Sequence, residues 1–307
     1  MTSIGTSSFY TSATTGLDKL SASLGTLQQQ ISTQNRLTHS YDDPVAAAQM
    51  RQLQAADTLA KTVSANTDAA NATLTQTSST ISQFTSILTD IQTLATQAAN
   101  GTLNASDKAS IATQINGYYQ NLVDLANTKD SYGNSLFSGT SSGPAYTVDA
   151  SGNATYAGSG TPASVSLGGS MTVTPSVTGP ELMNFTMSGG QSGNLLASVK
   201  SLADGLSAGT LTVSQMNASA GTFDQLSAAL DQLTTTQTVV GTRLNWITTA
   251  QDIQTTTTTQ RAQTRTDIGG TDLIAAAAQL SQQQLALEAS QASFIKLSGL
   301  SLFNYMK

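Results

Sequence analysis

The chain contains no cysteine among its 307 residues. This absence excludes disulfide bonds, thiol catalysis and cysteine-based metal sites. Charged residues make up only 10% of the sequence, whereas soluble domains usually have about a quarter. The 12 Lys and Arg residues do not cluster, and the net charge is −6. Binding to nucleic acid or to an anionic membrane surface depends on clustered basic side chains, so we expect neither partner.

Apolar side chains are also scarce, at 38% hydrophobic and 5% aromatic residues. Such a chain buries little apolar area per residue, so we expect helices with thin cores. No run of about 18 apolar residues is present, which excludes a membrane-spanning helix. The opening stretch, MTSIGTSSFYTSATTG, has neither the basic start nor the apolar segment of a secretory signal. If the protein is exported, we expect a route without a cleaved signal peptide.

Residues for catalysis or metal binding are equally sparse. The sole histidine, His39, lies in a polar stretch, and no GxSxG motif accompanies it. Asp42 and Asp43 are the best carboxylate pair, but neighbouring side chains diverge. Asp43 followed by Pro44 is typical of a helix N-cap and a first helical position. We therefore expect no enzyme, no metal site and no cofactor.

What the sequence does contain is regular apolar spacing. The segment GLDKLSASLGTLQQQIS, residues 16–32, has leucines and one isoleucine separated by 3, 4, 3 and 4 positions. This narrow seam is typical of a coiled-coil helix. Its residues are Leu17, Leu20, Leu24, Leu27 and Ile31. No nearby segment offers an obvious partner.

A second seam follows the Asp43-Pro44 break and continues from Leu53 to Ala98 with the same alternation. It predicts one long helix, stopped near Gly101. A further helix is predicted from about residue 106 to 130, with Ser106 and Asp107 as its N-terminal cap. We interpret the apolar residues of the long helix as intrachain core.

The middle of the chain, residues 140–190, differs in composition. It holds four of the five prolines, and Asp149 is the only charge between Gly139 and Pro180. The stretches AYTVDASGNATYAG and SVSLGGSMTVTP each read as two short strands around a turn. We predict a small β insertion; a disordered Ser/Gly/Thr linker is the alternative.

Helical patterns return in the last third. A seam runs from Phe223 through Leu226, Leu230, Leu233, Gln237, Val240 and Leu244 to Ile247. A threonine-rich stretch follows, which favours a soft helix. Asp267 and the Gly269-Gly270 pair predict a break, and a last helix begins at about Thr271. Four apolar residues recur there every seven positions: Leu273, Leu280, Leu287 and Phe294.

These patterns predict a mainly α protein with a small β insertion, built as an elongated helical bundle. An isolated helix with a narrow seam has little stability, so we expect the first and last helices to pair as a coiled coil. The predicted domains are 1–40 plus 268–307, 41–139 plus 191–267, and the insertion 140–190. Two narrow seams would still leave apolar surface uncovered, which favours self-assembly.

Four segments resemble the bacterial flagellin superfamily: RLTHSYDDPVAAAQM at 36–50, NSLFSGT at 134–140, VVGTRLNWI at 239–247 and SGLSLFNYMK at 298–307. Together the similar regions cover roughly 1–140 and 220–307. The motif residues are Asp42, Asp43, Pro44, Phe137, Ser138 and Gly139.

The resemblance implies a flagellin-like structural subunit of the flagellum whose two terminal helices line the inner tube of the assembly. Pro44 and the Phe-Ser-Gly run favour the branch that joins hook to filament; the alternative is a filament flagellin. The resemblance also implies that the end of the chain anchors in neighbouring subunits or in the export chaperone, through Leu300, Leu302, Phe303 and Tyr305.

The partners that the resemblance implies are further copies in a ring, a hook-side junction protein, filament flagellin or a second junction protein, and a flagellar export chaperone. The implied location is extracellular. A third alternative is a secreted enzyme or adhesin that uses the insertion, with glycan binding through Tyr146 and Tyr156.

Overall fold

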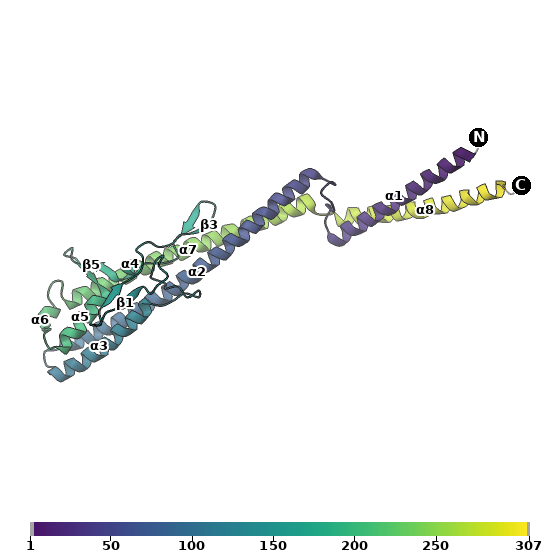
Figure 1. The fold of residues 1–307 in the computed structure, drawn as a ribbon. Coiled ribbons are helices and arrows are strands. Elements are labelled where there is room, and N and C mark those ends of the chain that lie inside the picture. The colour runs from purple at the N-terminus through teal and green to yellow at the C-terminus, as the bar shows by residue number, and fades with distance from the viewer. Residues whose placement is uncertain (1–2, 306–307) are drawn as a thin grey trace. The chain divides into compact units, whose positions relative to one another are not determined.

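The computed structural model describes residues 3–305, which are mainly helical (Figure 1). The α-helices are α1 (Ser3–Thr33), α2 (Pro44–Ala98), α3 (Ala105–Ala126), α4 (Gly179–Met183), α5 (Leu195–Ser207), α6 (Val213–Met216), α7 (Thr222–Gly269) and α8 (Leu273–Tyr305). The strands are β1 (Tyr146–Val148), β2 (Ala154–Tyr156), β3 (Val165–Gly168), β4 (Met171–Val173), β5 (Asn184–Thr186) and β6 (Ser192–Asn194).

The chain forms two compact units. The inner unit consists of residues 60–255, and the terminal unit consists of residues 3–59 together with 256–305. Helices α2 and α7 contribute to both units. The three-domain division predicted from the sequence stays a prediction.

The core of the inner unit follows the predicted seam of α2, which lies beside α7 (Figure 1). Every seam position from Thr67 to Ala98 is buried, as predicted. The buried hydroxyls of Thr67 and Thr77 each donate to the backbone carbonyl four residues earlier, at 2.8 Å. Since these hydroxyls are paired within the helix, threonine can occupy core positions without an unsatisfied donor.

The seam of α7 is partly shifted from the prediction. Leu226, Leu233, Val240 and Ile247 are buried as expected, but Leu230, Gln237 and Leu244 are only half-buried. Ala229, Thr236 and Ala250 take the buried places instead. The buried residues still repeat by 3 and 4 positions from Leu226 to Val240, but every second one lies one residue before the predicted place. The short side chains of Ala229 and Thr236 allow close packing there.

Helix α3 packs against α5 in the same unit. Its N-cap is Asn104, whose side-chain oxygen accepts from the backbone N–H of Asp107 at 2.9 Å. The predicted cap at Ser106 and Asp107 is therefore wrong, because an amide side chain two residues earlier satisfies the free N–H group.

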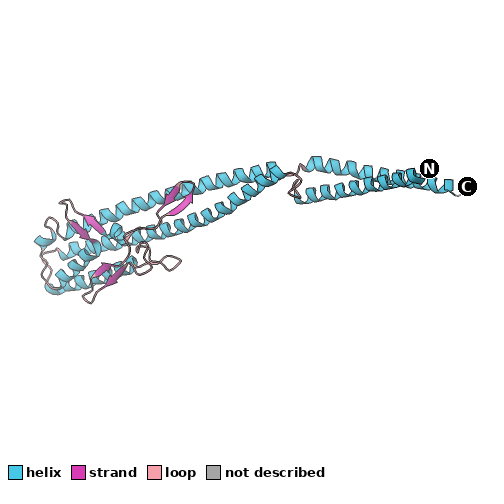
Figure 2. Cartoon of the chain, turned by 45° about the horizontal axis from the view of Figure 1, so that its top comes forward, coloured by secondary structure: helices cyan, strands magenta, loops and turns pink. Residues whose placement is uncertain are grey.

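The strands form three separate antiparallel pairs, β1–β2, β3–β4 and β5–β6, drawn in magenta in Figure 2. The first two pairs are the hairpins predicted from AYTVDASGNATYAG and SVSLGGSMTVTP. These paired strands contradict the alternative of a disordered linker. The third pair and the short helix α4 were not predicted.

In the terminal unit, α1 and α8 lie side by side in both views (Figures 1 and 2). The predicted pairing of the first and last helices is therefore confirmed. Helix α7 ends at Gly269, so the predicted break at the glycine pair is confirmed as well.

Candidate assembly interface

The pair of terminal helices has a thin core. Among the described side chains of α1 and α8, only Leu24, Leu27 and Ala276 are buried. The inner unit, by contrast, buries a long row of large apolar side chains along α2. Because burial of apolar area provides most of the stabilisation of a helix pair, α1 and α8 hold each other only weakly.

The other predicted seam residues contribute less to this contact. Leu17, Leu20, Ile31, Leu280, Leu287 and Phe294 are half-buried. Leu273 is 42% exposed, and Ala276 is the first buried position of α8. Leu300, Leu302, Phe303 and Tyr305 lie in the last turns of α8, where the structure describes only the backbone.

Large apolar side chains point away from the pair. On α8, Ile274, Leu285 and Ile295 are 85%, 67% and 70% exposed. Together with Leu273, α8 therefore exposes four large apolar side chains. A single exposed leucine or isoleucine is ordinary, but four on one helix make it a candidate for further contacts.

The α1–α2 loop and the α7–α8 loop are hydrogen-bonded to each other inside the terminal unit. Arg36 donates its backbone N–H to the carbonyl of Gly269 at 2.7 Å, and Thr271 donates to the carbonyl of Gln34 at 3.0 Å. Asn35 and Gly270 form an antiparallel bridge. We call residues 34–36 and 268–271, with these bonds, the clasp. It fixes the α1–α2 loop to the α7–α8 loop.

The Asp-Asp-Pro motif builds the start of α2. Asp43 accepts from the backbone N–H of Ala46 at 3.0 Å, which confirms it as the N-cap before Pro44. Asp42 instead accepts from Thr38 and from the backbone N–H of His39, at 2.7 Å. These backbone hydrogen bonds lower the pKa of both carboxyl groups. The two acids therefore have separate structural roles and do not act as a pair.

A second polar cluster, not found from the sequence, links α2 and α7 within the terminal unit. Asp57 accepts from Arg261 at 2.9 Å and also pairs with Arg265. A carboxylate held by two guanidinium groups fixes the helix register strongly. The sequence carries no local signal for this cluster, since the arginines lie more than 200 positions from the aspartate.

The Phe-Ser-Gly motif forms a tight corner in the inner unit. Phe137 is fully buried against Phe84, with ring centroids 6.2 Å apart. The buried Ser138 hydroxyl donates to the carbonyl of Ser141 at 2.8 Å. Gly139 has a φ of +66°, and a Cβ there would lie 2.2 Å from the carbonyl oxygen of Ser159. The motif residues are thus required by packing.

The two tyrosines considered for glycan binding are structural. Tyr146 is buried, and burial raises the pKa of its hydroxyl. The hydroxyl of Tyr156 donates to the carbonyl of Ser159 at 2.7 Å. Tyr146 therefore presents almost no surface to a glycan, while Tyr156 is half-buried. Glycan binding through this pair stays a hypothesis.

Residues 3–305 hold no group of three His, Asp or Glu side chains that could bind a metal ion. In the same part of the chain, no helix combines the length and hydropathy that crossing a bilayer requires.

Comparison with known proteins supports the resemblance read from the sequence. Residues 4–142 match the bacterial flagellin N-terminal helical region. The flagellar hook-associated protein 3 of Escherichia coli K12 is 28% identical over 298 residues, which cover 91% of this chain and 92% of that protein. The protein of the same name from Salmonella typhimurium LT2 is 32% identical over 136 residues, which cover 44% of this chain and 43% of that protein.

Solved structures support the fold. The crystal structure of flagellar hook-associated protein 3 from Legionella pneumophila superposes with a TM-score of 0.65 at 16% identity. The match covers 71% of this chain and 98% of that structure. The chain therefore has the fold of that structure, and its residues 4–142 are similar to the bacterial flagellin N-terminal helical region.

Proposed function

We propose that this protein is a structural subunit of the bacterial flagellum that forms a ring of identical copies between hook and filament. One observation carries the proposal: α1 and α8 bury only three described side chains, while α8 exposes four large apolar ones. A helix pair that is incomplete in one copy gains its remaining burial from neighbouring copies. Similarity to hook-associated protein 3 over 91% of the chain supports the junction rather than the filament.

In this proposal the terminal helices assemble and the inner unit faces outward. The seams of α1 and α8, with the end of the chain from Leu300 to Tyr305, contact neighbouring subunits. The further partners are a hook-side junction protein and filament flagellin or a second junction protein. The role is mechanical, without catalysis or a cofactor.

We also propose export without a cleaved signal peptide, in an unfolded state and with a dedicated chaperone. The thin α1–α8 core and the threonine-rich stretch of α7 would make unfolding easy. The absence of cysteine suits passage from a reducing to an oxidising compartment.

Deletion of the gene in its own bacterium tests the junction role. A junction subunit is needed to attach filaments, so the deletion is expected to leave hooks without filaments and to release filament flagellin into the medium. If the protein is instead the filament flagellin, the medium contains no filament subunits. Immunoblots of the medium and electron microscopy of the cells separate these results.

A further inference from the structure

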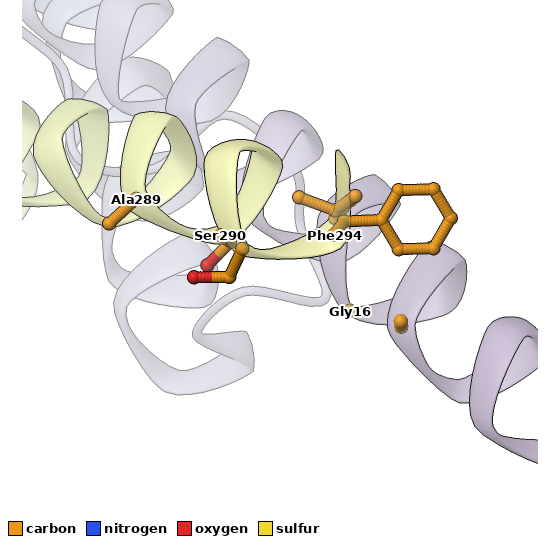
Figure 3. Close-up of a pocket in the computed structure, with 7 residues that line it drawn as sticks. Gly16, Ala289, Ser290 and Phe294 are labelled. Atoms are coloured by element: carbon orange, nitrogen blue, oxygen red, sulfur yellow. The ribbon is translucent and has the colours of Figure 1, made fainter. Parts of the chain in front are cut away.

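A groove runs between the two terminal helices. It is lined by Ala13, Gly16 and Leu17 from α1 and by Ala289, Ser290, Ser293 and Phe294 from α8, with a volume of about 490 Å³. Figure 3 shows Ala289, Ser290 and Phe294 along α8, with Gly16 on α1. We call this the α1/α8 groove.

The groove is open because its walls carry small side chains. A Cβ built on Gly16 would meet no atom within 4 Å. An engineered cavity of about 150 Å³ binds a benzene molecule, so the groove has room for at least one large apolar side chain. The Phe294 ring packs edge-on against Tyr10, with centroids 5.5 Å apart, and provides an apolar wall.

The same unit exposes side chains of suitable size on another side of α8. The half-buried Leu287 and Phe294 face α1, whereas Leu285 and Ile295 are exposed. Because the groove and these side chains lie on different sides of one helix pair, a copy cannot fill its own groove with them. They can reach only the groove of a second copy.

Charge also favours a second copy. Lys19 lies one turn after Gly16 on α1, and Glu288 lies one turn after Leu285 on α8. Both side chains are exposed, and neither forms an ion pair within the described residues.

The spacing on the two surfaces agrees. Glu288 lies seven residues before Ile295, about 10 Å along the helix, and Lys19 lies six residues after Ala13, about 9 Å. With the two helices antiparallel, Glu288 can face Lys19 while Ile295 enters the groove beside Ala13 and Gly16.

We propose that the α1/α8 groove of one copy receives Ile295 of a second copy, with Glu288 of the second copy opposite Lys19 of the first. The contact joins different surfaces of the two copies, so it can repeat head to tail around a ring. This inference rests on the proposed self-assembly and deepens it, because it names the two surfaces that meet.

Disulfide cross-linking tests the contact in assembled flagella, since the chain has no native cysteine. Ala292 is exposed one turn after Glu288, and a Gly16→Cys/Ala292→Cys chain is expected to form a ladder of linked copies when an oxidant is added. Disulfides need Cα atoms about 4.4–6.8 Å apart, so the ladder reports direct contact. A Gly25→Cys/Ala292→Cys chain is the matched control, because Gly25 lies on α1 outside the groove.

Filling the groove gives an independent readout. The readout is the number of hook–filament junctions that bind an antibody against residues 140–190. Gly16→Leu is expected to reduce this number at least tenfold, whereas Gly25→Leu should leave it unchanged. Both glycines have open space around them, so neither change disturbs packing within the chain. Lys19→Glu and Glu288→Lys should each lower the number about two- to fivefold, as expected for an exposed ion pair. The double reversal should restore it.

The outcomes distinguish this inference from the proposed function. If the antibody finds the native chain at the junction but the Gly16→Cys/Ala292→Cys chain forms no ladder, the groove contact is wrong and the junction role stands. A cross-link to a protein other than a second copy also overturns the contact. If the antibody does not find the native chain at the junction at all, the proposed function fails, and this inference with it.

Discussion

The guanidinium of Arg36 donates a hydrogen bond of 3.0 Å to the carbonyl oxygen of Ile268, 232 positions further along the chain. Carbonyl groups in the last turn of a helix have no partner within the helix, so Arg36 satisfies one at the end of α7. The same side chain also contacts Asp43, the N-cap of α2. One residue of the α1–α2 loop therefore holds two helix ends.

Arg36→Ala is expected to open the clasp without unfolding the inner unit. The loss of a hydrogen bond from a charged donor costs about 1 kcal/mol at this exposed site. The backbone N–H of Thr271, which donates to Gln34 in the clasp, should then exchange with solvent about fivefold faster. Arg51→Ala is the control, since Arg51 is an exposed residue of α2 outside the clasp. Equal exchange rates in both variants would remove the role given to Arg36.

The Phe-Ser-Gly corner gives a prediction with two separable costs. Gly133→Ala forces a residue with a side chain into a left-handed conformation but meets no neighbour, so a loss of about 1 kcal/mol is expected. Gly139→Ala adds a clash with the Ser159 carbonyl and should cost at least about 2 kcal/mol more. Chemical denaturation of the two variants measures the difference. Similar losses for both would show that the corner can relax.

Two buried tyrosines should respond oppositely to removal of the hydroxyl group. The Tyr119 hydroxyl donates to the carbonyl of Gly152 at 2.7 Å and accepts from the backbone N–H of Ala154 at 2.9 Å. Tyr119→Phe should therefore cost about 1–3 kcal/mol. The hydroxyl of Tyr146 is buried without a partner within the described residues. Tyr146→Phe should leave the free energy of unfolding unchanged or raise it; a large loss would show that the hydroxyl has a partner in the folded protein.

The cap at Asp43 predicts a pH dependence. Its hydrogen bond from the Ala46 N–H lowers the carboxyl pKa below the ordinary value of 3.8. The stabilisation is then fully present above the unfolded pKa and is lost as the pH falls through the lower folded pKa. The difference in thermal midpoint between native chain and Asp43→Asn should be constant above pH 5 and disappear at lower pH. A difference that grew on acidification would contradict this assignment.

Disruption of the α1–α8 pair should leave the inner unit folded. Leu24 and Leu27 are the buried leucines of α1, so Leu24→Asp with Leu27→Asp introduces two charges into a thin core. Assembly is expected to be lost while the inner unit keeps its cooperative unfolding transition, measured by circular dichroism. Loss of that transition as well would indicate a single closed core.

The long helices could be predicted because their apolar residues repeat at helical spacing. The seam from Thr67 to Ala98 is an example. The two hairpins could also be predicted, because short strand-forming stretches flank turns that contain glycine. These features depend on residues close together in the sequence, whose pattern reports their environment directly.

The rest depends on contacts between distant segments. Nothing near Arg36 or Asp57 indicates partners more than 200 positions away. Leu273 continues the sevenfold repeat, yet it is exposed, while Ala276, which lies outside the repeat, is buried. A repeat predicts which face of a helix is apolar but cannot show which residues of that face the partner helix covers.

The measurement that tests the junction role most directly is electron microscopy of sheared flagella labelled with antibody against residues 140–190. The junction role predicts one label on each flagellum, at the boundary between hook and filament. Label along the whole filament would contradict it and make the protein a filament subunit.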